Sequence, residues 1–269
     1  MAVLGTVLAL LAAACGEPAP PTLRQPDART VAAAITEDGL RARLVALAAV
    51  TEGSSQYRSV GSEGYDRAAT LVEEELRAAG WTVTPDAYDA AAFVDEGGSS
   101  LEVGGRTFGV DDLRPLIFAP PGDVEGPVIP IDWDPGATDR TGRGCAVTHY
   151  GDLPAHSIVV VRSGDCLRRD QVIAARQAGA AAFVAVYPGA PAGIVFRPTL
   201  IEPRFMEIPA AAVSREAAEA RVAAAASGGT AHLVTRARTE QAPTRSIIAE
   251  LPGSEPGPVI MLGAHLDSV

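Results

Sequence analysis

The most constraining feature of this sequence is the stretch from Ser246 to Val269, SIIAELPGSEPGPVIMLGAHLDSV. Two apolar runs, Ile247–Leu251 and Val259–Leu262, flank the Pro- and Gly-rich segment Pro252–Pro258. This pattern predicts a strand, a tight reversal and a second strand. The second run is apolar without alternation, which is typical of a strand covered on both faces in an α/β sheet. The stretch therefore favours an α/β fold.

The predicted second strand is followed directly by the motif Gly263-Ala264-His265-Leu266-Asp267-Ser268. Ligands of open α/β sheets bind in crevices beyond the carboxyl ends of the strands, so His265 is well placed to meet a metal ion. Asp267 could accept a hydrogen bond from the other imidazole nitrogen, which would fix the tautomer and the ring orientation. A His-x-Asp pair alone is weak evidence, because many structural histidines have such a partner. The residues themselves leave both roles open.

The whole phrase resembles the first metal-site motif of the co-catalytic zinc aminopeptidases, which are secreted bacterial and vacuolar exopeptidases with a two-zinc site. In that family the His of the motif binds zinc, and the Asp two residues later holds the imidazole. The resemblance implies that His265 is a zinc ligand and that Asp267 is its orienter. It also implies two Zn²⁺ ions per complete site and peptides as substrates.

A helix is predicted to begin at Ser62 and to end at Gly80, a typical C-cap glycine. Its apolar residues recur along one face, formed by Tyr65, Ala68, Ala69, Val72 and Leu76. The acidic run Glu73–Glu75 lies mostly on the other face, and we interpret it as a solvated helix surface rather than a metal site. An earlier helix is predicted after the cap residue Thr36, with one apolar stripe formed by Leu40, Leu44 and Leu47.

The phrase Gly61-Ser62-Glu63-Gly64-Tyr65, followed by Leu76-Arg77-Ala78-Ala79-Gly80-Trp81, resembles the opening helix and strand of the same aminopeptidase family. Trp81–Thr84 is the predicted strand. Farther on, Leu101–Phe108 predicts a hairpin that turns at Gly104-Gly105. Because this match is independent of the C-terminal motif, the two together favour the same family.

From about residue 111 to residue 240 the pattern changes to short apolar strands separated by helices. The predicted strands are Val128–Ile131, Ile158–Val161, Ala182–Tyr187 and Ile208–Val213. Helices are expected near Asp170–Ala178 and Arg215–Ala226. The phrases Ile158–Cys166 and Ala174–Ala182 resemble a protease-associated (PA) domain, which in this family is often inserted just before the first zinc motif. The resemblance implies a small α/β or β-rich domain within the peptidase domain.

Two cysteines, Cys145 and Cys166, form an even pair within the PA-like segment. In an exported protein we expect a disulfide between them. It would close a loop of about 20 residues and stabilise the fold by about 3 kcal/mol in the chain-entropy model. The alternative is two reduced thiols that are buried separately. We interpret His149, His156 and His232 as surface or structural histidines, because they lack Cys or His partners at ligand spacing.

The N-terminus indicates the compartment. Val3–Ala14 is apolar but too short to span a bilayer as a helix, and it ends in Ala-Ala-Ala-Cys-Gly at residues 12–16. This pattern resembles a bacterial lipoprotein signal peptide, which implies lipidation of Cys15; an ordinary secretory signal is the alternative. Glu17–Arg29 is rich in Pro and polar residues, which predicts a tether. We expect an extracytoplasmic protein, either lipid-anchored to the cell membrane or secreted.

The net charge of −11 argues against nucleic acid and against anionic membrane surfaces as partners. A lipid anchor would then be the membrane contact, and peptides would be the partners. We expect an α/β fold, the N-terminal part of a zinc-exopeptidase α/β sandwich that a PA domain interrupts. The expected segments are a signal peptide at 1–15, the tether at 16–34, peptidase domain at 35–110, the PA domain at 111–240, and peptidase domain again at 241–269.

The family resemblance implies a zinc aminopeptidase that releases N-terminal residues from peptides. Its site needs a metal-bridging Asp, a Glu base beside a Glu ligand, a further Asp ligand and a distant His, which we expect beyond Val269. Two other functional classes stay open. One is a lipoprotein whose PA domain binds a peptide or protein and whose peptidase part is vestigial. The other is a structural envelope lipoprotein. A reading frame that continues for roughly 150–250 residues past Val269 would favour the peptidase.

The polypeptide 1–269 by itself is expected to bind no stoichiometric zinc and to lack aminopeptidase activity. One imidazole cannot hold a catalytic zinc ion, which usually has three protein ligands. Metal analysis of the purified polypeptide and hydrolysis of an aminoacyl-anilide test this. Robust turnover that a chelator abolishes would show the expectation to be wrong.

Overall fold

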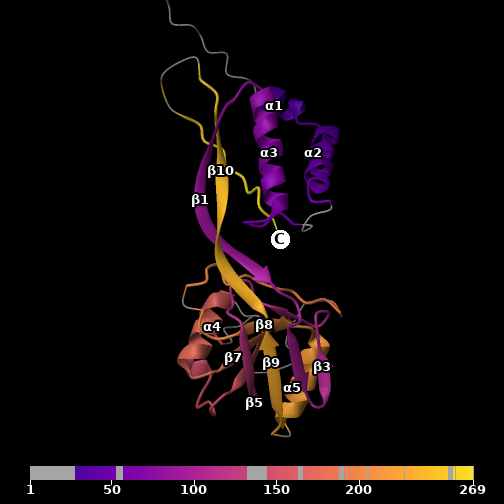
Figure 1. Ribbon diagram of the computed structural model, residues 1–269, viewed down its shortest axis with the longest axis vertical. Coiled ribbons are helices and arrows are strands. Elements are labelled where there is room, and N and C mark those ends of the chain that lie inside the picture. The colour runs from indigo at the N-terminus through magenta and orange to yellow at the C-terminus, as the bar shows by residue number, and fades with distance from the viewer. Residues whose placement is uncertain are drawn as a thin grey trace, which may run out of the picture.

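The computed structural model describes residues 28–52, 57–131, 144–162, 166–187, 191, 193–204, 206–226, 228–253, 257 and 259–268. The expected signal peptide, Cys15 and most of the tether lie outside these residues. A group of helices and a lobe built on a large sheet are joined by one long two-stranded ribbon (Figure 1). We call these parts the helix group, the sheet lobe and the ribbon.

The helix group consists of α1 (Ala28–Ala34), α2 (Glu37–Ala49) and α3 (Glu63–Ala78). Helix α1 occupies the last residues assigned to the tether. The predicted caps are present, because the side chains of Thr36 and Ser62 accept hydrogen bonds from the backbone N–H groups of Gly39 and Tyr65. These bonds satisfy donors that a helix N-terminus would otherwise leave without a partner.

The apolar stripe expected on α2 is not a core face. Helix α2 has no buried residue, and the side chains of Leu40 and Leu44 are 55% and 68% exposed. Of the three leucines in the stripe, Leu47 alone lines a shallow groove between α2 and α3, beside Ala46. Leu71, Val72 and Leu76 line it from α3. Spacing alone could not show this, because an apolar stripe indicates a face without specifying what covers it.

The acidic run on α3 is also different from the prediction at one position. Glu73 is buried, whereas Glu74 is exposed as expected. The Glu73 carboxylate accepts hydrogen bonds from Arg245 at 2.8 Å and from Arg77 at 3.1 Å. The partner on the ribbon lies far away in sequence, so the helical pattern gave no sign of it.

The ribbon is formed by β1 (Thr82–Asp95) and β10 (Ala237–Glu250), which pair antiparallel along their whole length. The register runs from Thr82 opposite Glu250 to Asp95 opposite Ala237. Helix α3 packs on it, and the hydroxyl of Tyr65 donates a hydrogen bond to the carbonyl of Arg245 at 2.7 Å. The two strands carry the chain into the sheet lobe and back (Figure 1).

The sheet lobe contains eight strands in the order β3-β2-β9-β5-β6-β7-β8-β4. Its strands are β2 (Ser100–Val103), β3 (Arg106–Phe108), β4 (Leu113–Pro115), β5 (Gly122–Ile131), β6 (Ile158–Arg162), β7 (Ala182–Val186), β8 (Ala210–Val213) and β9 (Thr230–Thr235). The four apolar runs predicted as strands form β5 to β8, which are parallel to one another. The mixed α/β fold class is therefore confirmed.

Alternate residues of the central strands point to two separate cores. Val159 and Phe183 belong to the core on the side of α4 (Arg168–Gln177), and Ile158 and Val184 belong to the core on the side of α5 (Arg215–Ala226). Every residue of β6, β7 and β8 is buried. Burial on both faces explains why these strands have continuous apolar sequences. A 3₁₀ turn, η1 (Val147–His149), lies between β5 and β6.

The predicted hairpin is present as β2 and β3. Gly104 and Gly105 have φ values of +57° and +72°, as a two-residue turn of this hand requires. The expected segment 35–110 includes this hairpin, whereas in the structure β2 pairs with β9 of the sheet lobe.

The second strand of the C-terminal hairpin is not formed. The side chains of Val259–Leu262 are 87–90% exposed, and these residues lie outside every strand. Ile247–Glu250, the other half of the expected hairpin, pairs with β1 instead. Among the described residues no strand lies beside 259–262, and a strand without a neighbour has no partners for its backbone groups.

Replacing Glu73 by Gln is expected to lower the free energy of unfolding at pH 7 by about 1.5–3 kcal/mol, the range for hydrogen bonds to charged groups. The Arg245 guanidinium lowers the pKa of Glu73 below its usual value. The contribution is therefore present above the unfolded pKa and is lost as pH falls through the folded pKa. Denaturant titrations should show the difference at pH 7 and its loss as the pH falls through the lowered pKa of Glu73. Glu74→Gln is the control, and an equal effect of both changes at pH 7 would contradict the assignment.

Candidate functional site

The C-terminal segment is attached to the residues that precede α3. The backbone N–H of Arg58 donates to the Ser268 carbonyl at 2.9 Å, and the Ser268 N–H donates to the Arg58 carbonyl at 3.0 Å. The Arg58 side chain adds a third bond from Nε to the Leu266 carbonyl at 2.9 Å. These three bonds place the His265 motif beside the start of α3.

A glycine makes this attachment possible. A Cβ atom at Gly64 would lie 2.3 Å from the carbonyl oxygen of Tyr57, so a larger residue would push the two segments apart. The close approach brings Tyr57 and Arg58 against the first turn of α3. The sequence phrase that resembles the family therefore has a local physical role.

His265 and Asp267 are brought together as the sequence predicted. Nδ1 of His265 lies 2.9 Å from Oδ1 of Asp267, and the two side chains are 92% and 50% exposed. A carboxylate that accepts the Nδ1–H bond leaves Nε2 of the neutral ring with its lone pair, which is the form that binds a metal. Among the described residues, however, no group of three or more His, Cys, Asp or Glu side chains could hold a metal ion.

A cleft lies between the helix group, the ribbon and the sheet lobe. Its volume is about 320 Å³, and Asp267 lies on its wall. The other principal lining residues are Tyr57, Phe93, Asp95, Phe118 and Arg197. The rings of Phe93 and Phe118 meet edge to face with centroids 6.3 Å apart. Sequence patterns gave no sign of this cleft, because its walls come from five separate parts of the chain.

One ion pair lies within the cleft. Nη1 of Arg197 is 3.0 Å from Oδ2 of Asp95, and the two side chains are 27% and 24% exposed. The same guanidinium lies 5.9 Å from the ring centre of Phe93. The pair joins the end of β1 to a loop of the sheet lobe, and its two charges offset each other.

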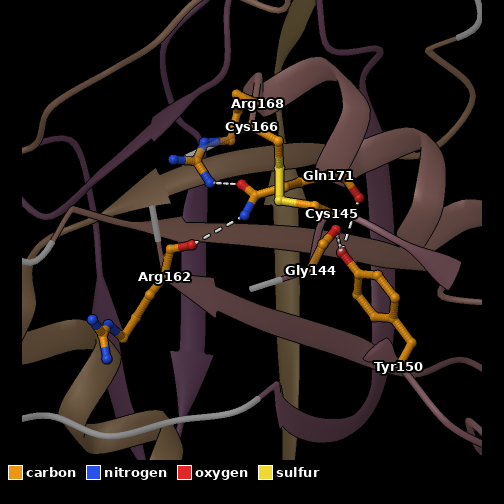
Figure 2. Close-up of a disulfide and its surroundings, with 7 residues drawn as sticks. All are labelled: Gly144, Cys145, Tyr150, Arg162, Cys166, Arg168 and Gln171. Atoms are coloured by element: carbon orange, nitrogen blue, oxygen red, sulfur yellow. Dashed lines mark hydrogen bonds between the residues drawn. A yellow bond between two sulfur atoms is a disulfide. The ribbon is translucent and has the colours of Figure 1, made fainter. Parts of the chain in front are cut away.

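Cys145 and Cys166 are joined by a disulfide, with their Cα atoms 6.0 Å apart (Figure 2). Beside it the Tyr150 hydroxyl lies 2.9 Å from the carbonyl oxygens of both Gly144 and Gln171, and it donates its proton to either of them. Burial raises the pKa of this phenol above its usual value. Burial also lowers the pKa of Arg168, whose side chain contacts Gln171, to about 10. This is a packed structural network, and the sequence gave no sign of it.

The remaining histidines lie on the surface of the sheet lobe. His149 and His156 are exposed. Nε2 of His232 lies 2.6 Å from Oδ1 of Asp123, and this hydrogen bond raises the pKa of His232. Their positions agree with the interpretation that they are surface or structural histidines.

Comparison with known proteins adds the family context. Residues 124–221 match the PA domain family. An aminopeptidase of Pseudomonas aeruginosa is 26% identical over 240 residues, which are 84% of this chain and 42% of that protein. The probable lipoprotein aminopeptidase LpqL of Mycobacterium tuberculosis is 29% identical over 242 residues, 87% of this chain and 45% of that protein.

The chain contains a PA domain and is a distant homologue of aminopeptidases. It spans less than half the length of these curated relatives.

Solved structures show the same fold. The aminopeptidase from Aneurinibacillus sp. strain AM-1 superposes with a TM-score of 0.60 at 15% identity, over 77% of this chain and 47% of that one. A zinc aminopeptidase from Bacillus subtilis gives a TM-score of 0.57 at 18% identity, over 78% and 47% of the two chains. The segment of this chain that matches the PA domain, residues 124–221, lies within the sheet lobe. No helix among the described residues is long and apolar enough to cross a membrane.

Replacing Arg58 by Ala is expected to speed amide exchange at Ser268 by about tenfold or more. The change removes the side-chain bond to the Leu266 carbonyl, and a bond from a charged donor contributes about 1.5–3 kcal/mol. Local opening of the segment then becomes easier. NMR-detected hydrogen exchange measures this. Arg41→Ala, on an exposed face of α2, is the control; equal exchange at Ser268 in both variants would refute a holding role for Arg58.

Proposed function

We propose that this chain forms the first part of an extracytoplasmic zinc aminopeptidase that removes N-terminal residues from peptides, with His265 as a zinc ligand. The observation that carries the proposal is the contact between His265 and Asp267, at 2.9 Å, in a chain homologous to aminopeptidases. A His-x-Asp sequence pattern alone would be insufficient evidence for a zinc ligand. The contact, the sequence motif and the homology support the same role.

The donor set fits zinc at this one position. Imidazole is a common zinc ligand, and a carboxylate on its second nitrogen is the usual arrangement at such sites. Because catalytic zinc usually has three protein ligands, His265 needs partners beyond the described residues. When bound, zinc would lower the pKa of a water molecule and polarise the scissile carbonyl.

The residues of this chain would have two tasks at the site. Asp267 would hold the Nδ1 proton and keep the ring in one orientation. Arg58 would hold the backbone of the motif through its bonds to Leu266 and Ser268. Both tasks concern position, and both can be altered without removing the metal-binding nitrogen.

Export supports the compartment part of the proposal. The structure contains the disulfide between Cys145 and Cys166, and such bonds persist in oxidising compartments. One homologue is named a lipoprotein aminopeptidase. We propose on this basis that Cys15 is lipidated, which mass spectrometry of the membrane-associated protein would show.

The second candidate is a PA-domain lipoprotein that binds a peptide or protein without cleaving it. The PA match at 124–221 favours it, since that domain contains none of the residues proposed to act in catalysis. Retention of peptide binding together with the absence of hydrolysis in the natural gene product would decide for this candidate.

The test uses the natural gene product in full, including any residues that follow Val269. Wild type should bind two zinc ions and hydrolyse leucine p-nitroanilide in a chelator-sensitive reaction. Asp267→Asn should reduce zinc affinity or activity by about 10–100-fold, as is typical for a partner of a ligand. His265→Ala should lose more than that, because the ligand itself is gone.

His232→Ala is the matched control, because His232 also pairs with an Asp but lies on the sheet lobe. It should keep wild-type zinc content and turnover. Wild-type turnover in the His265→Ala variant would rule out the assigned ligand, and absence of any chelator-sensitive turnover in the wild type would rule out the peptidase.

A further inference from the structure

His232 lies on the outer face of three neighbouring strands of the sheet lobe. Its strand, β9, pairs antiparallel with β2 on one side and with β5 on the other. Burial alternates along β9, and Ala231 and Leu233 are buried in the core on the side of α5. His232 therefore points to the opposite face, where its side chain is 40% exposed. The buried neighbours fix this register, because a slip of one residue would turn His232 into the core.

Three carboxylates surround His232 on this face. Glu102 of β2 and Glu125 of β5 are its direct partners across the two strand pairs. Asp123 stands two residues before Glu125 on the same face, and its Oδ1 lies 2.6 Å from Nε2 of His232. Glu102, Glu125 and His232 line one hollow, and none of its described lining residues is Lys or Arg. A protonated His232 is therefore the cation that offsets these carboxylates.

The charge of the imidazole changes with pH in the neutral range. The hydrogen bond to Asp123 raises the pKa of His232, and the charges of Asp123, Glu125 and Glu102 raise it further against a smaller effect of burial. Because the folded pKa is raised, the stabilisation is fully present below the unfolded pKa of about 6.5. It is lost as the pH rises through the folded pKa. Above that pH the same face carries three negative charges and no positive one.

We propose that His232 and its three carboxylate neighbours form a pH-sensitive clasp, which tightens the pairing of β2, β9 and β5 when the imidazole is protonated. The neutral ring can keep a hydrogen bond through its Nε2–H group, but it no longer offsets the negative charges. The three strands then pair less firmly. The inference is independent of the proposed peptidase function, because none of these residues belongs to the motif at His265.

The position of the clasp connects it to the rest of the molecule. Residues 96–99 alone join β1 to β2, and Arg236 alone joins β9 to β10. The two connections are bonded to each other, because the Arg236 N–H donates to the Ser99 hydroxyl at 2.8 Å. The clasp thus holds together the strands through which the ribbon enters and leaves the sheet lobe (Figure 1). The pH of the surroundings would therefore set how firmly the edge of the PA domain is held at the ribbon.

Hydrogen exchange of the natural gene product, detected by mass spectrometry, measures the clasp. After correction for the intrinsic exchange rate at each pH, peptides from β2 and β9 report a local opening constant. It should be about three- to tenfold larger at about pH 9 than at about pH 5.5, the scale of a few exposed opposite-charge pairs acting together. Peptides from β6 and β7 provide the internal reference. Salt at about 1 M should reduce the difference, because it screens exposed charges.

His232→Gln keeps an N–H donor for Asp123 and removes the titration. Relative to the internal reference, its β2 and β9 peptides should open equally at both pH values. His149→Gln is the matched control, because His149 is an exposed histidine of the same lobe that lies in η1, outside the clasp. This control should keep the wild-type pH response. An equal pH response in the wild type and in His232→Gln would overturn the proposal.

An NMR titration of the histidine rings gives a readout that a purely structural role would not change. His232 should titrate above the usual histidine value of about 6.5, and Asp123→Asn should lower its pKa. Titration of His232 at or below the usual value, or an unchanged pKa in Asp123→Asn, would overturn the clasp. If circular dichroism shows that His232→Gln is unfolded, Asp123→Asn takes its place in the exchange experiment, and its pH response should be smaller than that of the wild type.

Discussion

Antiparallel pairing between β1 and β10 is the interaction on which the rest of the structure depends. The chain enters the sheet lobe on one strand and leaves it on the other, and each strand has 14 residues. The same ribbon supports α3, through the Tyr65 hydroxyl bond to the Arg245 carbonyl and the Arg245–Glu73 ion pair. The return strand also determines where the C-terminal motif begins. Loss of the ribbon would therefore separate the PA domain from the proposed zinc ligand.

The ribbon was also the hardest element to predict. The sequence predicts strands at Trp81–Thr84 and Ile247–Leu251, whereas Pro85 and Pro243 stand within the longer strands that form the ribbon. Proline removes a donor, which usually excludes it from a sheet interior. In a two-stranded ribbon each strand has an outer edge with no partner, so these prolines can be tolerated. Local sequence propensity cannot predict that two strands pair only with each other.

The parallel strands of the sheet lobe were predictable for the opposite reason. β6 and β7 are buried on both faces, so all of their positions except Arg162 at the end of β6 are apolar and the sequence shows a continuous run. The Gly104-Gly105 turn was equally local, because its two positive φ values require glycine. Val259–Leu262 has the same kind of apolar run but stays exposed. An apolar run of this kind predicts a strand that is buried on both faces. It does not show whether the neighbouring strands and helices are present.

Of the candidate site, the sequence predicted what lies close together along the chain. His265 and Asp267 are two residues apart, so a local motif was sufficient. Arg58 meets Leu266 across 208 residues, and Arg197 meets Asp95 across 102. Neither contact can be predicted from residue types or from their spacing along the sequence. Both depend on the folded ribbon, which brings the helix group and the sheet lobe to the same place.

The ribbon register has a consequence for the cleft. Side chains alternate between the two faces of a strand, so a slip of one residue would turn Phe93 to the opposite face and replace it with a neighbour. Asp95, two residues further on, lies on the same face as Phe93 and would turn away with it. The aromatic wall and the partner of Arg197 would then be lost together. A single structural variable, the pairing of Phe93 with Thr239, thus fixes both the apolar and the charged part of the wall beside Asp267.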